Sequence, residues 1–161
     1  MKSTTYGIKE VRLTILREEP FSAPCKVETP EQLNPVIETI TKTHPYFNPE
    51  VEQFFVFFMN TRHVITGWQL VATGTLDTIL VHPREVFKAA IVANAASIII
   101  SHNHPSGDTT PSDADIKITR NLIQAGQLLK IEILDHVIFG FETSTKNLKS
   151  TSLRSLGYFY S

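Results

Sequence analysis

The stretch IIISHNHPSGDTTPSDADIKI, residues 98–118, has in succession the features of a buried strand, a sharp turn and the start of a helix. Its three consecutive isoleucines are typical of a strand that is buried on both faces. Pro-Ser-Gly at 105–107 favours a turn, and Ser112 with Asp115 three positions later resembles the capping box of a helix N-terminus. The stretch therefore predicts a strand–turn–helix unit.

Two histidines and an aspartate give this unit the side chains of a metal site. His102 and His104 are two positions apart at the end of the strand, so they project on the same side. Asp115 lies one turn into the helix, on the same face as Ser112, and the turn can bring it back toward the histidines. Two imidazoles and a carboxylate, with a fourth position left for water, are the ligands of a catalytic zinc site.

A simpler interpretation explains each of these residues singly. The histidines could end a strand, the Pro-Ser-Gly segment could be an ordinary turn, and Ser112 with Asp115 could be a helix cap alone. This interpretation does not explain why all of them occur together just outside the carboxyl end of a strand, where ligands bind in open α/β sheets. We therefore favour the metal site.

Strands and helices alternate along the rest of the chain, which predicts a single α/β domain with a mixed sheet. The apolar pattern predicts strands at 10–18, 51–60, 64–74, 77–82, 97–101 and 130–140. Helical spacing predicts helices at 29–42, 82–96 and 112–129. Pro35 fits the first of these helices only in or near its first turn. We expect three parts: a strand and helix that belong to the domain or pack on it (1–42), a metal-binding core (43–145) and a C-terminal tail (146–161).

The composition is typical of a globular protein. The chain has 161 residues, of which 42% are hydrophobic and 19% are charged, and disordered chains are less apolar. No apolar run approaches the roughly 18–20 residues of a membrane helix, and the first residues lack the apolar core of a signal peptide. We therefore expect a cytoplasmic protein with no membrane association.

The charge limits which partners are possible, and the cysteine content limits which side chains can hold a metal. Lys and Arg number 15 against 16 Asp and Glu, and no basic cluster is present. Nucleic-acid binders normally have a basic face, so the charge does not support direct binding to nucleic acid, although it leaves it open. Cys25 is the only cysteine, which excludes an intramolecular disulfide and disfavours a cysteine zinc site. Any metal must therefore be held by His, Asp, Glu and water.

A resemblance to a known family makes this interpretation more specific. HNHPSGDTTPSDAD (102–115) resembles the JAMM, or MPN-plus, metalloprotease motif, in which His-x-His is followed by seven residues and then Ser-x-x-Asp. The wider sequence, from about Glu52 to Gly140, resembles the RadC-like JAB domain. The resemblance implies a three-layer α/β/α fold of the cytidine-deaminase-like type, with a mixed sheet flanked by helices. It also implies one Zn²⁺ per chain, held by His102, His104 and Asp115.

The same resemblance implies roles for further residues. A glutamate that begins an early strand acts as the base in the superfamily, and it corresponds here to Glu52, with Glu50 as the fallback and Glu85 as a more distant match. The serine that stabilises the tetrahedral intermediate corresponds to Ser112. Such a site would cleave a peptide or isopeptide-like amide with a metal-activated water. Full-length RadC proteins carry an N-terminal helix-hairpin-helix region, and we expect this chain to resemble the short members without it.

Three further residues near the motif have expected roles. Asp135 and His136 also match the RadC-like pattern, but neighbours on a strand face opposite ways, so at most one of them can approach the metal. We expect a structural role for them, or one in orienting a ligand. Ser106 follows the second ligand, and we expect it to bind the backbone of the turn.

Two other classes of function compete with a hydrolase acting on an unknown peptide or protein substrate. A zinc nucleobase deaminase shares the implied fold, but it needs His-x-Glu and Pro-Cys-x-x-Cys, and a chain with one cysteine lacks them. The stronger alternative is a metal-stabilised interaction module without turnover, for example in DNA repair or in defence against host restriction. The sequence does not indicate an oligomeric state.

Overall fold

Five strands form one mixed sheet in the computed structural model, which describes residues 26–74 and 81–160. The spatial order is β2-β1-β3-β4-β5; β3 and β4 run parallel, and the other neighbours run antiparallel. The strands are β1 (Glu52–Met59), β2 (Ile65–Gly74), β3 (Ser97–Asn103), β4 (Glu132–Phe141) and β5 (Leu148–Ser152).

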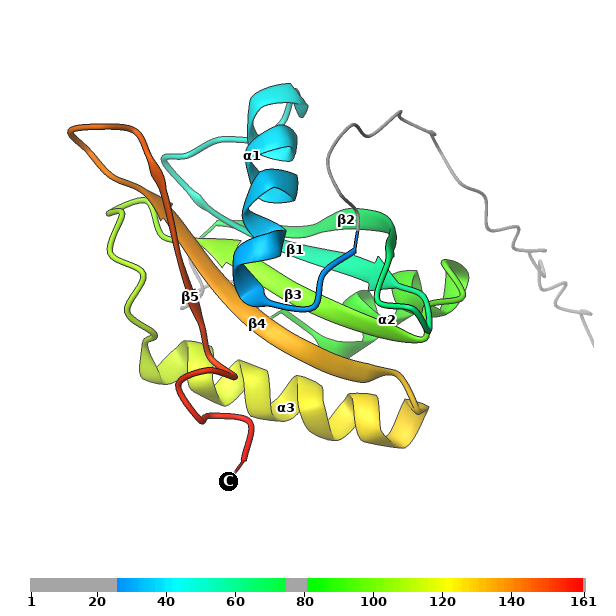
Figure 1. The fold of residues 1–161 in the computed structure, drawn as a ribbon. Helices are drawn as coiled ribbons and strands as arrows, with labels where there is room; N and C mark the ends of the chain where they lie inside the picture. The colour runs from blue at the N-terminus through cyan, green and yellow to red at the C-terminus, as the bar shows by residue number, and fades with distance from the viewer. Residues whose placement is uncertain (1–25, 75–80, 161) are drawn as a thin grey trace, which may run out of the picture.

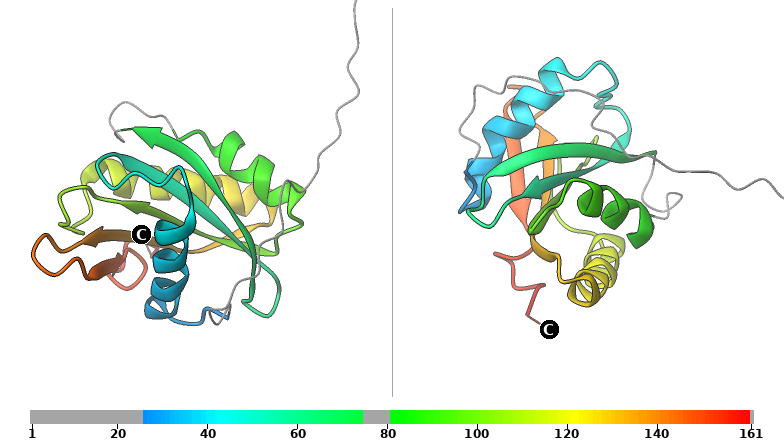
Figure 2. Two further views of the ribbon diagram at one scale, coloured as in Figure 1. Left: turned by 90° about the horizontal axis from the view of Figure 1, so that it is seen from above. Right: turned by 90° about the vertical axis from the view of Figure 1, so that its right-hand side faces the viewer.

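Helices cover both faces of this sheet (Figure 1). One face carries the 3-10 helix η1 (Pro30–Leu33) and α1 (Asn34–Thr43), whereas the other carries α2 (Pro83–Val92) and α3 (Asp113–Leu129). Figure 2 shows the same layers from two further sides. This three-layer α/β/α arrangement with a mixed sheet confirms the predicted fold class.

The inner strands β1 and β3 are apolar on both faces because helices cover both faces. Phe54 and Ile100 belong to the cluster that packs under α2 and α3, whereas Phe55 and Ile99 belong to the cluster that packs under α1. Successive residues of a strand point to opposite faces, so a strand between two helical layers needs apolar residues at nearly every position.

The helix predicted at 29–42 begins as η1 and continues as α1. Pro35 lies in the first turn of α1, where its missing N–H breaks no helical hydrogen bond. Before it, Gln32 Oε1 accepts hydrogen bonds from the main-chain N–H groups of Glu28 and Thr29. The chain therefore changes from one helix type to the other where a proline is tolerated.

The expected C-terminal tail contains a strand of the sheet. Residues 148–152 form β5, which pairs with β4. The sequence of β5, LKSTS, has one apolar residue and so lacks the alternation that would predict a strand. Leu153, which follows it, is fully buried. The predicted strand at 10–18, Cys25 and all but two residues of the strand predicted at 77–82 lie outside the described residues.

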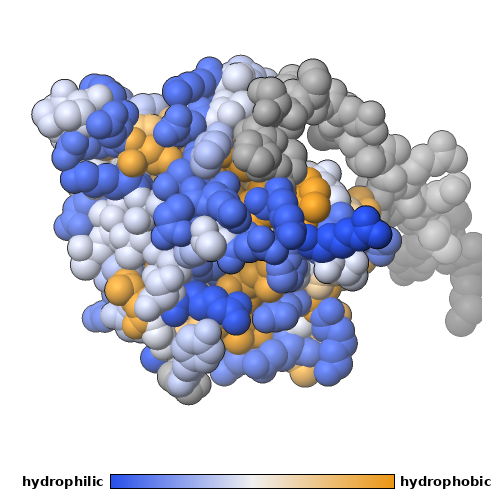
Figure 3. Space-filling view, viewed as in Figure 1, coloured by the Kyte–Doolittle hydropathy of each residue, from blue (hydrophilic) through white to orange (hydrophobic). Residues whose placement is uncertain are grey.

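The face seen in Figure 3 is mostly polar, with apolar residues in small separate patches. Large apolar side chains that are exposed in the described part of the chain include Tyr46, Leu128, Leu156 and Tyr160. None of the helices in the described ranges combines the length and the apolar character needed to cross a bilayer. Most apolar side chains of the described elements instead fill the two layers between the sheet and its helices.

Candidate metal centre

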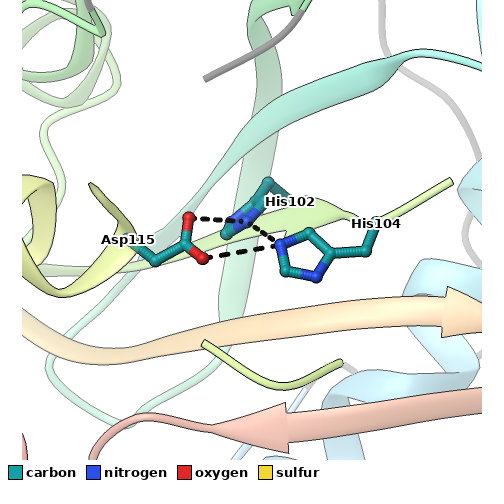
Figure 4. Close-up of side chains that lie close together, drawn as sticks. All are labelled: His102, His104 and Asp115. Atoms are coloured by element: carbon teal, nitrogen blue, oxygen red, sulfur yellow. Dashed lines mark hydrogen bonds and ion pairs between the residues drawn. The ribbon is translucent and has the colours of Figure 1, made fainter. Parts of the chain in front are cut away.

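Three side chains converge at the carboxyl end of β3 (Figure 4). His102 is the penultimate residue of β3, His104 follows the strand, and Asp115 lies in the first turn of α3. His102 Nε2 lies 3.1 Å from His104 Nε2 and 3.1 Å from Asp115 Oδ1, and His104 Nε2 lies 3.5 Å from Asp115 Oδ2. His102 and Asp115 are fully buried, whereas His104 is partly exposed.

These separations fit a metal ion with tetrahedral ligands. Ligands about 2.0–2.1 Å from zinc lie about 3.3 Å from one another along the edge of a tetrahedron, and the three separations lie on either side of that value. Asp115 Oδ1 is buried and accepts no hydrogen bond from the described residues, although His102 Nε2 faces it. The residues present can therefore hold a metal ion with two imidazoles and one carboxylate.

The loop after β3 orients the imidazole of His104. Its Nδ1 atom lies 2.6 Å from the main-chain oxygen of Asp108, and because a carbonyl can only accept, Nδ1 carries the hydrogen. The lone pair of a neutral His104 then lies on Nε2, facing the carboxylate of Asp115. Such a pair is stable only with a proton or a cation between them, and the hydrogen bond to Asp115 accordingly raises the pKa of His104.

A second histidine orients His102. His102 Nδ1 lies 2.8 Å from Nε2 of His136 on β4, and His136 Nδ1 lies 2.6 Å from Oγ1 of Thr119 on α3. Burial lowers the pKa of His136 well below its ordinary value, so this side chain is neutral. The ring of Phe54 stacks against His102 with ring centres 6.0 Å apart. Packing and hydrogen bonding therefore both fix the orientation of the His102 ring.

Asp115 is both a helix-capping residue and one of the three residues, with His102 and His104, that could hold a metal ion. Its Oδ2 atom accepts 2.7 Å hydrogen bonds from the N–H and from the hydroxyl of Ser112, whose oxygen accepts from the Asp115 N–H at 3.1 Å. Burial alone would raise the pKa of Asp115, but the neighbouring imidazoles of His102 and His104, together with the Ser112 N–H, hold that pKa well below its ordinary value. The carboxylate is therefore ionised, and the capping box and the metal site share its atoms.

Two glycines allow the loop after β3 to lie against β4. Gly107 has a positive φ of 79°, and a Cβ atom there would lie 2.6 Å from the main-chain oxygen of Phe141. A Cβ atom on Gly140 would in turn lie 2.9 Å from the Gly107 Cα atom. Ser106 contributes to the same turn, since its hydroxyl accepts a 3.3 Å hydrogen bond from the Asp108 N–H. The turn residues thus place the Asp108 carbonyl beside His104.

Glu52 begins β1 beside the histidines. The antiparallel register pairs Phe54 with His102, and continuing it two residues outward sets Glu52 opposite His104. Glu52 and His102 line the same hollow. The charge of Glu52 also adds to the hydrogen bond from Asp115 in raising the pKa of His104. The expected base and the expected ligands therefore lie at one place.

The other two glutamates that could match the base lie elsewhere. Glu50 is exposed in the turn before β1. Glu85 lies in the first turn of α2, where its carboxylate is 2.7 Å from the ammonium of Lys88. Of the three glutamates, Glu52 is the one that shares a hollow with His102.

Asp135 faces away from its neighbour His136 and joins β4 to the segment around β5. Its Oδ2 atom accepts a 2.6 Å hydrogen bond from the Ser152 hydroxyl, and Oδ1 accepts from the N–H groups of Arg154 and His136. Burial raises the pKa of this carboxyl despite these donors. Of the two neighbours, His136 is the one that contacts an expected metal ligand.

Two further polar residues support the site through hydrogen bonds. Thr119 was recognisable only as part of the buried side of a helix, yet its hydroxyl contacts His136. Asn103 Oδ1 accepts a 2.8 Å hydrogen bond from the Gln53 N–H, and its Nδ2 donates to the Val51 oxygen at 2.9 Å. These bonds hold the start of β1 against the end of β3, and the available signal was a polar residue between two ligands.

Comparison with known proteins shows the family. The model of the RadC-like JAB domain matches residues 27–157, which extends the resemblance to α1 and β5. A UPF0758 protein of Caldanaerobacter subterraneus is 46% identical over 108 residues, covering 67% of this chain and 44% of the relative. UPF0758 proteins of Bacillus cereus and Chlorobaculum tepidum are 51% and 54% identical over 89 residues, covering 55% of this chain and 40% of each relative.

These relatives leave the activity open. Their names state no activity, and the chain spans less than half the length of each of them. The match with the family model nevertheless covers most of the chain, including every helix and strand in the described ranges. The chain therefore belongs to the RadC-like JAB domain family.

Proposed function

We propose that this domain is a zinc-dependent hydrolase of the JAMM type that cleaves a peptide or isopeptide-like amide. The observation that carries the proposal is the convergence of His102, His104 and Asp115 at separations of 3.1 to 3.5 Å. Nitrogen and oxygen ligands with a fourth position open to water favour zinc. When bound, zinc would lower the pKa of a coordinated water and polarise the carbonyl of the amide.

We assign the proton transfers to Glu52. Glu52 lines the hollow beside His102, where its carboxylate could accept a proton from the attacking water and deliver it to the leaving nitrogen. The bond between the Gln53 N–H and Asn103 supports this role, because it fixes the start of β1 next to the strand that carries the ligands.

We assign the stabilisation of the developing oxyanion to Ser112. Its hydroxyl donates to Asp115 Oδ2, but the Ser112 N–H donates to the same oxygen at 2.7 Å. The hydroxyl could therefore turn toward a substrate oxyanion without leaving Oδ2 unpaired. One serine would then serve both as helix cap and as oxyanion donor.

Metal analysis and a cleavage assay test the proposal together. We expect one zinc per chain in the purified protein and none in His104→Ala. In a screen of peptide and isopeptide substrates, Glu52→Gln should keep its zinc and lose about 100-fold or more in rate. Glu50→Gln, two positions earlier and exposed, is the matched control and should cleave like the wild type. Absence of zinc under metal-replete conditions would contradict the proposal.

A metal-stabilised interaction module is the second candidate function. Asp115 caps α3 and contacts the histidines of β3 and its following loop, so a metal there would also tie the helix to the sheet without any turnover. Full biological activity in Glu52→Gln would favour this module. A role in DNA repair or in mobile-element defence stays a prediction for either candidate, and the net charge of −1 does not support direct contact with nucleic acid.

A further inference from the structure

A line of three hydrogen bonds begins at Nδ1 of His102. This atom lies 2.8 Å from Nε2 of His136, Nδ1 of His136 lies 2.6 Å from Oγ1 of Thr119, and that oxygen lies 2.6 Å from the main-chain oxygen of Asp115. All four residues are fully buried. Each group therefore depends on its neighbour in the line for a hydrogen-bond partner.

The main-chain oxygen of Asp115 determines the direction of every bond in this line. A carbonyl has no hydrogen to donate, so the hydroxyl of Thr119 donates to it. That hydroxyl has one hydrogen, so toward His136 it can only accept, and His136 Nδ1 must carry the hydrogen. Nε2 of the neutral His136 is then an acceptor, and His102 Nδ1 donates to it.

We propose that Thr119 and His136 are positioning residues that hold His102 in the tautomer with its hydrogen on Nδ1, so that Nε2 presents its lone pair to the metal. This inference rests on the proposed metal site. A histidine ligand usually donates its second N–H to a carbonyl, a carboxylate or water, as His104 does to Asp108. His102 meets an imidazole instead, which could donate or accept. Because the hydroxyl of Thr119 accepts from Nδ1 of His136, Nε2 of His136 can only accept the hydrogen bond from His102.

Removal of the Thr119 hydroxyl should exchange the donor and the acceptor in the hydrogen bond between His136 and His102. In Thr119→Val, the hydrogen on His136 Nδ1 would be buried without an acceptor, which disfavours that tautomer. With its hydrogen on Nε2, His136 would donate to His102 Nδ1, and the hydrogen of His102 would move to the atom that should bind the metal. The hydrogen bond between His136 and His102 would then have to break, and Nε2 of His102 would have to lose its hydrogen, before His102 could bind zinc.

Two measurements on Thr119→Val, Thr119→Ser and the wild type test the proposal. Competition with a chromophoric chelator gives the zinc affinity, and long-range ¹⁵N–¹H spectra of the metal-free protein give the tautomers of the histidine rings. Thr39→Val is the matched control, because the Thr39 hydroxyl also donates to the carbonyl four residues earlier, that of Pro35 on α1, but belongs to no line of imidazoles.

We expect hydrogen on Nδ1 of both His102 and His136 in the wild type. Thr119→Val should move it to Nε2 in both rings and weaken zinc binding by about 10- to 100-fold. Thr119→Ser and Thr39→Val should match the wild type in both measurements.

Two results would overturn the positioning role: wild-type zinc affinity in a folded Thr119→Val, or hydrogen on Nε2 of His102 in the wild type. If Thr119→Val does not fold, the wild-type tautomers decide the question, and His136→Phe, which removes the acceptor for His102, should weaken zinc binding. If the wild type binds no zinc, the proposed function fails, and the tautomers still support or overturn the line of hydrogen bonds.

Discussion

The Nδ1 atom of His104 lies 2.6 Å from the main-chain oxygen of Asp108, so a loop carbonyl orients one of the expected metal ligands. The loop reaches this position by passing Gly107, whose Cα lies against Gly140 on β4. Because Gly107 has a φ of +79° and no room for a side chain, the orientation of His104 depends on a residue that touches no ligand.

Gly107→Ala should destabilise the protein and weaken its metal binding. The left-handed backbone costs a residue with a Cβ roughly 1–2 kcal/mol, and the Cβ would lie 2.6 Å from the Phe141 oxygen. Gly157→Ala is the control, because φ is +89° there and nothing lies within 4 Å of an added Cβ. Denaturant titration should show a larger loss for Gly107→Ala than for Gly157→Ala, and equal losses would mean that the contact with Phe141 relaxes freely.

Zinc should raise the thermal stability of the wild-type protein. A ligand that binds only the folded state adds about 2.7 kcal/mol to the free energy of unfolding when its free concentration is about 100 times Kd. Differential scanning fluorimetry with zinc and with chelator should therefore show a higher melting temperature with the metal. His104→Ala removes one of the three converging side chains, and a zinc-dependent shift that persists in this variant would place the binding elsewhere.

Substitutions of Ser112 should separate its capping role from its proposed catalytic role. Ser112→Ala removes the hydroxyl that caps α3 and should cost about 0.5–2 kcal/mol of stability, whereas glycine at an N-cap costs only a few tenths. Both variants lack the proposed oxyanion donor, so both should lose the same factor in kcat. Wild-type kcat in Ser112→Gly would show that the serine serves the helix alone.

The convergence of His102, His104 and Asp115 could be predicted because these residues are close in the sequence. His102 and His104 share one strand end, and Asp115 belongs to the helix that follows directly, so local geometry brings them together. The hydrogen bonds that link His102 through His136 to Thr119 could not be predicted in this way. His136 is 34 positions away, and whether it or Asp135 faces the site depends on the register of β4 against β3. That register shifts between Ile98 and Ile99, and a slip of one residue would exchange the two faces.

The edge strand β5 escaped prediction for a different physical reason. Strand patterns come from burial of alternate side chains, and β5 is held by pairing with β4 and by the contact of Ser152 with the buried Asp135. A polar segment that satisfies a buried carboxylate leaves no apolar pattern in its sequence. Its place in the fold therefore follows from Asp135, which the sequence left without an assigned partner.

The stability of Asp135→Asn, measured relative to the wild type, should increase as the pH rises. Burial raises the pKa of Asp135 above its ordinary 3.8, so between these two values the folded state binds more protons than the unfolded state. Stability from this group is then fully present below about pH 3.8 and is lost as the pH rises through the raised pKa. Asparagine cannot ionise, and it can still accept from the Arg154 N–H and donate to the Ser152 hydroxyl.

Melting temperatures of both proteins from about pH 4 to pH 7 measure this difference, which should grow in favour of Asp135→Asn. Glu142→Gln is a control of opposite sign, because a hydrogen bond and charge from Lys149 lower the pKa of Glu142. The stability from this ion pair is fully present above the ordinary pKa of a glutamate and is lost as the pH falls through the lowered pKa, so the stability of Glu142→Gln relative to the wild type should decrease as the pH rises. A constant difference between Asp135→Asn and the wild type would mean that the hydrogen bonds from Ser152, Arg154 and His136 compensate fully for the burial of the ionised Asp135.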